Sequence, residues 1–126
     1  MHKLQFEPAW DRTISAKDRN LIERTFHESE PSEQTFTPLR QAINHNKDLL
    51  VTVIVNNNTQ RLLSFKNKEL EYLENEQLIA EHIFTIPALA INPNSSMPWT
   101  FIFPKQSIKK EPQLSNGRLY MKEKLD

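Results

Sequence analysis

Apolar residues at helical spacing predict one α-helix near the N-terminus of the chain. In residues 15–28, Ile22 and Phe26 fall on the same face as Asp18, and neither glycine nor proline interrupts the segment. Ser15 followed three residues later by Asp18 is typical of a capped helix start. Because the apolar stripe is narrow, we expect this helix to lie on another element of the fold. No other part of the first thirty residues has a helical pattern.

From residue 34 onward, apolar and polar residues alternate with a period of two, which predicts strands. The strongest strand, residues 49–55, is rich in β-branched residues and has apolar side chains on both faces, which is typical of a central strand. Trp99, Phe101 and Phe103 share one face of a strand over 99–103 and predict an aromatic layer of the core. The remaining expected strands cover residues 35–44, 61–65, 69–74, 77–86 and 88–91.

Several short strands separated by turn residues predict a mainly β fold. We expect an antiparallel β-sandwich of immunoglobulin-like architecture, with the N-terminal helix packed on it. Pro38 restricts the strand over 35–44 to an edge or a bulge. Beyond Pro104 the periodicity fades. The sequence therefore predicts a single domain over residues 1–106 and a mobile C-terminal tail over 107–126, with a short extended segment near residues 119–121.

The chain contains one glycine and no cysteine. One glycine excludes the glycine-rich loops that cradle phosphates, and the lack of cysteine excludes disulfides, thiolate metal sites and cysteine nucleophiles. Turns that need a positive φ must then use another residue, and asparagine tolerates that geometry best after glycine. We therefore predict a left-handed backbone at one or more of Asn57, Asn58 and Asn75.

Charge and hydropathy exclude further classes of protein. Sixteen Lys and Arg residues balance sixteen Asp and Glu residues, which is atypical of a nucleic-acid-binding domain. No segment approaches the roughly 18 consecutive apolar residues of a transmembrane helix, and the N-terminus lacks the pattern of a signal peptide. We expect a cytoplasmic protein that neither binds nucleic acid nor inserts directly into a membrane.

No residue pattern predicts a catalytic, metal or cofactor site. The histidines are not spaced as ligand pairs. Four carboxylates stand within residues 69–76, and two of them, Glu69 and Glu71, alternate with Leu70 and Tyr72, as on the solvent face of a strand. We therefore expect a protein that is not an enzyme and needs no cofactor. The alternative is a small-ligand-binding or hydrolytic domain that uses His45, His82 and these carboxylates, since two acids suffice for some hydrolases.

An aromatic strand after a proline suggests a place where a partner could bind. Trp99 follows Pro98, and a proline at the start of a strand often marks a sheet edge. An unblocked edge can pair with a strand of another protein or of a second copy of this chain. For alternating aromatic residues the core is the default interpretation, and partner binding at an edge is the alternative that stays open at this stage.

Several segments together resemble the SLAP domain of Bacillus-type Firmicutes. The resemblance covers roughly residues 10–104, and its most specific part is residues 96–104, SMPWTFIFP. It also includes residues 38–45, PLRQAINH, and residues 48–53, DLLVTV. The spacing of Trp10, Ile14, Asp18, Ile22 and Phe26 is similar to the N-terminal part of that family.

The resemblance implies a role in the cell envelope or in secretion, without catalysis. SLAP domains occur singly in small proteins, and duplicated in a larger protein that is linked to an accessory Sec system and to S-layer assembly. We therefore expect a non-enzymatic protein-interaction module, accessory to protein export or to S-layer assembly. Its partner would be a protein, and a homo-oligomer formed through an edge strand is a further expectation. The candidate partner-binding residues are Arg40, Asn44, His45, Trp99 and Thr100, of which the first three can also simply stabilise a turn.

Overall fold

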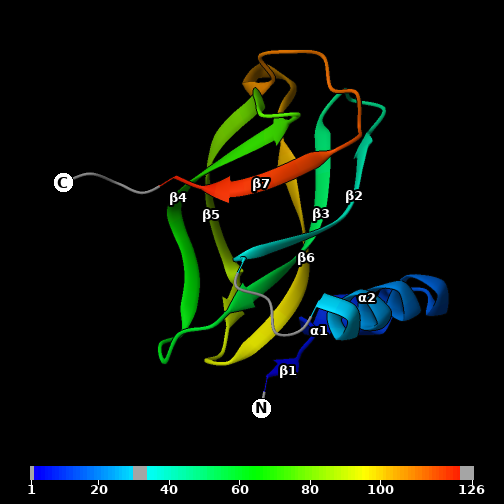
Figure 1. Cartoon of the computed structure of the whole chain (residues 1–126), viewed down its shortest axis with the longest axis vertical. Coiled ribbons are helices and arrows are strands. Elements are labelled where there is room, and N and C mark those ends of the chain that lie inside the picture. The colour runs from blue at the N-terminus through cyan, green and yellow to red at the C-terminus, as the bar shows by residue number, and fades with distance from the viewer. Residues whose placement is uncertain (1, 30–33, 123–126) are drawn as a thin grey trace.

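The computed structural model describes residues 2–29 and 34–122 and contains two packed β-sheets with helices on one of them. Sheet A has the strand order β1-β6-β3-β2, and sheet B has the order β5-β4-β7 (Figure 1). The fold is a mainly β sandwich, as predicted. The strands are β1 (Lys3–Leu4), β2 (Phe36–Ile43), β3 (Leu49–Asn57), β4 (Leu63–Glu74), β5 (Gln77–Ile91), β6 (Ser95–Phe103) and β7 (Gly117–Met121).

The predicted helix is α2 (Ala16–Ser29), and the Ser15 hydroxyl accepts a hydrogen bond from the Asp18 N–H at 3.1 Å, as a cap does. A second, six-residue helix, α1 (Pro8–Thr13), precedes it and was not expected from the sequence. Proline stands at its first position, and the Glu7 carboxylate accepts hydrogen bonds from the amides of Ala9 and Trp10. Both features favour a helix start and are visible in the sequence. A short 3-10 helix, η1 (Lys105–Ser107), follows β6.

The central strand β3 is covered on both faces, as predicted. Alternate residues from Leu49 to Val55 lie in the core between the sheets. The opposite face of β3 carries Ile54, which packs with Ile22 and Phe26 of α2. The helices therefore lie on the outside of sheet A, and in the described residues no helix covers the outside of sheet B (Figure 1).

Two predicted breaks in the strands are bulges within longer strands. Residues 61–65 and 69–74 contribute to one strand, β4, whose register with β5 shifts between Phe65 and Lys68. The register also shifts where Pro87 interrupts β5, so residues 77–86 and 88–91 form a single strand. Pro38 lies next to a register shift in β2, which is itself an edge strand, so both predicted consequences of this proline are found.

The segment expected to be a mobile tail contributes a strand to the sandwich. β7 pairs with β4, and its Leu119 is only 4% exposed. Residues 107–122 therefore do not form a loose tail, although a short extended segment near 119–121 was anticipated. Residues 123–126 of that predicted tail lie outside the described part of the chain. The strand was missed because its pattern is too short to show a clear period of two.

Asparagine makes several of the tight corners, as predicted. Asn75 has φ 50° in the turn between β4 and β5, and Asn67, Asn94 and Asn116 also have positive φ. Gly117, in contrast, has no positive φ. A Cβ at this position would lie 2.6 Å from Cε1 of Tyr72, so glycine is present because the buried Tyr72 ring lies directly over the backbone.

Candidate protein-binding groove

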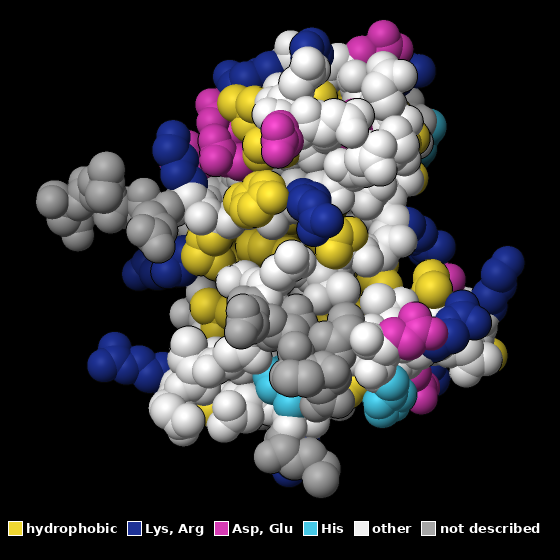
Figure 2. Space-filling view, in the orientation of Figure 1, with side chains coloured by type: hydrophobic (Ala, Val, Ile, Leu, Met, Phe, Trp, Pro, Cys, Tyr) yellow, Lys and Arg dark blue, Asp and Glu magenta, His cyan; other side chains and the backbone are white. Residues whose placement is uncertain are grey.

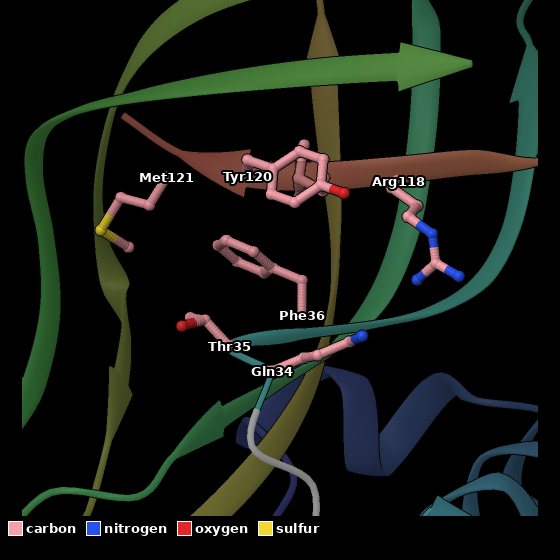
Figure 3. Close-up of a pocket in the computed structure, with 7 residues that line it drawn as sticks. Gln34, Thr35, Phe36, Arg118, Tyr120 and Met121 are labelled. Carbon is pink, nitrogen blue, oxygen red and sulfur yellow. The ribbon is translucent and has the colours of Figure 1, made fainter. Parts of the chain in front are cut away.

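A groove separates the two sheets at the corner where β2 faces β7. These strands approach within 8 Å between Cα atoms, but no strand pairing joins them in the described part of the chain. The groove has a volume of about 220 Å³. Its lining residues come from the two strands and from the two residues that precede β2 (Figure 3): Gln34, Thr35, Phe36, Arg118, Leu119, Tyr120 and Met121.

The floor of the groove is the core of the sandwich. Phe36 and Leu119 are each 4% exposed, and the Phe36 ring lies 5.8 Å from the Phe101 ring in an edge-to-face arrangement. Tyr120 projects from β7 and is 48% exposed, while Met121 is partly buried against the core. A segment bound in this groove would therefore cover apolar surface that is continuous with the core.

Both walls of the groove are sheet edges with backbone groups that point away from their own sheet. Asn56 N–H donates to Thr35 O at 2.7 Å, and Lys122 N–H donates to Glu69 O at 2.8 Å. Hydrogen-bonded and non-hydrogen-bonded pairs alternate along an antiparallel ladder. The backbone groups of Phe36, next to Thr35, and of Met121, next to Lys122, therefore point outward and can pair with an added strand.

Basic side chains lie beside the groove, although Glu76 lines the neighbouring hollow that Arg118 and Tyr120 also line. The groove continues past Thr35 and Met121 into a hollow of about 520 Å³ that Lys66, Lys68 and Lys122 line, with one carboxylate, Glu69, among them. Lys122 Nζ lies 3.8 Å from Glu69 Oε2. Figure 2 shows the same face, with apolar side chains gathered across its middle and Lys and Arg side chains among and around them.

Most cations of this surface have no carboxylate partner among the described residues. Among residues 2–29 and 34–122, neither Arg118, Lys66 nor Lys68 has a carboxylate within ion-pair distance. The groove therefore has a positive rim, although the chain as a whole is neutral.

A buried polar network holds β7, one wall of the groove, in place. The Tyr72 hydroxyl donates to Oε2 of Glu74 at 2.7 Å, and Glu74 is 3% exposed. The same carboxylate accepts hydrogen bonds from the amides of Gln113 at 2.7 Å and Leu114 at 2.9 Å, in the segment that leads into β7. Burial, then the hydrogen bond to Glu74 and the charge of Glu74, raise the pKa of Tyr72 well above its usual range.

Sequence reasoning missed this network, although a signal was present. Leu70, Tyr72 and Glu74 have the same parity along β4 and therefore share its core-facing side. A carboxylate at a core-facing position indicates a buried polar network, because a buried charge needs hydrogen-bond donors.

The five residues predicted to bind a partner are distributed over sheet A and do not lie at this groove. Thr100 lies on the face that carries α2, where its hydroxyl is 2.8 Å from that of Thr52. Arg40 pairs with Thr52 in the sheet register and lies 3.4 Å from the Asp18 carboxylate. Trp99 stacks on Trp10 of α1 at 5.9 Å between ring centroids.

Asn44 and His45 lie in the turn between β2 and β3. Oδ1 of Asn44 accepts hydrogen bonds from the amides of Asn46 at 2.9 Å and Asp48 at 3.0 Å. The Asn44 side chain thus stabilises the turn. His45 is exposed at the tip of the same turn.

The two histidines considered for hydrolytic chemistry are separated in the structure. His45 belongs to a turn of sheet A, whereas His82 lies on β5 of sheet B with its ring 4.9 Å from that of Phe84. Within the described residues, no three histidines or carboxylates are placed so that they could hold a metal ion. The helices of the described part are also too short or too polar to cross a membrane.

Comparison with known families shows which family the chain is related to, which the geometry alone does not show. Residues 4–123, nearly the whole chain, match the model of the SLAP domain. The chain belongs to the SLAP domain family. Membership connects this SLAP domain in general terms with S-layer-associated functions. Searches among curated proteins and among solved structures gave no significant match.

Proposed function

We propose that this SLAP domain is a non-enzymatic protein-interaction module in the cytoplasm, accessory to protein export or to S-layer assembly. Membership in the SLAP family supports the general setting. The observation that carries the proposal is the groove between β2 and β7, which combines an apolar floor with two sheet edges that are unpaired within the described residues. Addition of a strand to such an edge is a common way to recognise an extended segment of another protein.

The edge of β6 offers a second place for strand pairing. β1 pairs with this edge only at Ser95 and Ser96, so in the described residues no strand pairs with it from Met97 onward, although Trp10 of α1 stacks on Trp99 there. This stretch includes Trp99 and Thr100, which were predicted to bind a partner. Self-association of the domain through β6 is therefore the second candidate interaction, and sedimentation at several protein concentrations tests it.

Site-specific photocrosslinking tests the proposed function. A benzophenone amino acid replaces Tyr120 at the groove, and in a control variant it replaces Leu62, which is 56% exposed in the loop between β3 and β4. We expect crosslinking in the native host to trap an export or S-layer protein from position 120 and not from position 62. Recovery of no such protein from position 120, with the variant folded as wild type, would contradict the proposal.

A further inference from the structure

We propose that the β2–β7 groove binds an extended segment in which acidic and apolar residues alternate. This inference rests on the proposed function, because it specifies the chemistry of the partner that the same groove would recognise. Three features of the groove support the inference. Backbone groups of β7 point outward, and an added strand would have one face toward apolar side chains and the other toward polar ones. Nearby cations also have no carboxylate partner among the described residues.

The backbone of β7 provides the pairing. Outward amide and carbonyl groups at Leu119 and Met121 alternate with groups that bond to β4. Paired strands lie about 4.8 Å apart, so a segment paired with β7 needs that much space beside β7. The groove provides this space where it widens past Met121 into the hollow lined by Lys66 and Lys68. The Phe36 backbone, on the opposite wall, offers further hydrogen-bonding groups near that position.

An added strand would have an apolar face and a polar face. Its side chains must alternate between the interior of the sandwich and the outer face of sheet B. Those that point inward meet the floor formed by Phe36 and Leu119, which accepts apolar groups. Those that point outward continue the row of Arg118, Tyr120 and Lys122 along β7.

The outward positions favour carboxylates. Arg118 is exposed and, like Lys66 and Lys68, has no carboxylate partner among the described residues, whereas Glu69 already lies beside Lys122. A segment with acidic side chains at alternate positions would place them beside these cations. The same cations disfavour a basic segment, so charge supplies the selectivity and the apolar floor supplies the contact area.

Binding of synthetic peptides tests this inference directly. The probe is a fluorescent octapeptide of alternating Glu and Val, followed by fluorescence anisotropy with the full chain. The controls are a Lys–Val octapeptide and a Glu–Val octapeptide whose valine amides are N-methylated. We expect binding of the first peptide only, with affinity reduced about tenfold or more for each control. Equal binding of the N-methylated peptide would overturn strand pairing, and equal binding of the Lys–Val peptide would overturn the charge selectivity.

Charge reversal in the protein provides the matching test. Arg118→Glu and, separately, Lys68→Glu should each weaken binding of the Glu–Val peptide about tenfold. Arg24→Glu, on the exposed face of α2, is the same type of substitution away from the groove and should leave the affinity unchanged. Circular dichroism shows whether each variant is folded. Unchanged affinity in both folded groove variants would overturn the inference.

The two proposals fail in different ways. A protein crosslinked at position 120, together with no binding of the Glu–Val peptide, would overturn the alternating acidic chemistry and leave the interaction function in place. Binding of the peptide, together with no export or S-layer protein crosslinked at position 120, would support the groove chemistry and contradict the proposed cellular role.

Discussion

The two sheets meet at two corners that are built differently. At the closed corner, β5 and β6 follow each other in sequence, and the turn between them is tied to β3 by the buried amide of Asn57. This amide donates to the carbonyls of Arg61 at 2.7 Å, Ile91 at 2.9 Å and Asn92 at 3.2 Å. At the open corner, β2 and β7 are distant in sequence. No strand pairing joins them in the described residues.

The difference indicates that the closed corner contributes more to the stability of the fold, whereas the open corner leaves surface for binding. The two N–H groups of the buried Asn57 side chain are shared among three carbonyls, which ties together the chain segments at the closed corner. The open corner instead exposes the edge of the core, and its wall β7 depends on the network of Tyr72, Glu74 and Gly117. Substitutions at the closed corner should therefore affect stability most, and those around β7 should affect it less while changing the groove.

The largest effect is expected for Asn57→Ala. This change leaves buried carbonyls of the closed corner without their donor and removes the acceptor for Thr59 N–H at 3.0 Å. We expect a loss of about 3 to 4 kcal/mol in the free energy of unfolding, measured by urea denaturation. Asn46→Ala, at an exposed turn position, should cost less than about 0.5 kcal/mol. A loss below about 1 kcal/mol for Asn57→Ala would show that the closed corner does not depend on this amide.

Gly117→Ala should have the next largest effect. The added methyl group would collide with the buried Tyr72 ring and push β7 from its place, at a cost of about 2 to 3 kcal/mol in the free energy of unfolding. The cost should shrink in a Tyr72→Leu background, which removes the ring, and a double-mutant cycle measures that coupling. Equal costs in both backgrounds would mean that Tyr72 does not determine the need for glycine.

Glu74→Gln tests how the open corner is held. Glutamine replaces one accepting oxygen by a donor. Gln113 loses its partner if the new amide group takes the place of Oε1, and Tyr72 and Leu114 lose theirs if it takes the place of Oε2. We expect a loss of about 2 kcal/mol and faster hydrogen exchange of the β7 amides than of the β3 amides. Glu76→Gln, at an exposed position in the neighbouring turn, is the control. Uniform acceleration in both strands would contradict a local role for Glu74.

The smallest expected effect is a pH dependence that originates at Tyr72. Its pKa is raised in the folded state from the ordinary value of 10.0, so the folded protein keeps the proton that the unfolded chain loses above that pH. The stabilisation is complete below pH 10, and stability falls as pH rises further, by about 1.4 kcal/mol per pH unit. Urea denaturation of wild type and Tyr72→Phe between about pH 9 and about pH 11 isolates this contribution. Parallel curves for the two proteins would contradict it.

The sequence predicted those parts of the fold whose pattern is local. The stripe of Ile22 and Phe26 located α2, and alternation in residues 49–55 identified β3 as a central strand. The strand β7 has only Leu119 buried between exposed neighbours, and it is stable because it pairs with β4. The groove could not be predicted, because its two walls are brought together only by the packing of the sheets. None of the residues proposed for binding from the sequence lines it.

The long separation of β2 and β7 along the chain also has a consequence for folding. The β4–β5 hairpin closes through the two-residue turn at Asn75 and Glu76, and such local pairings form early. The β2–β7 corner requires contacts between strands that are far apart in sequence, and the loop-closure entropy of such contacts is larger than that of a hairpin. The groove should therefore be assembled in a late folding step, so a partner would encounter a complete binding surface only on molecules that have already folded.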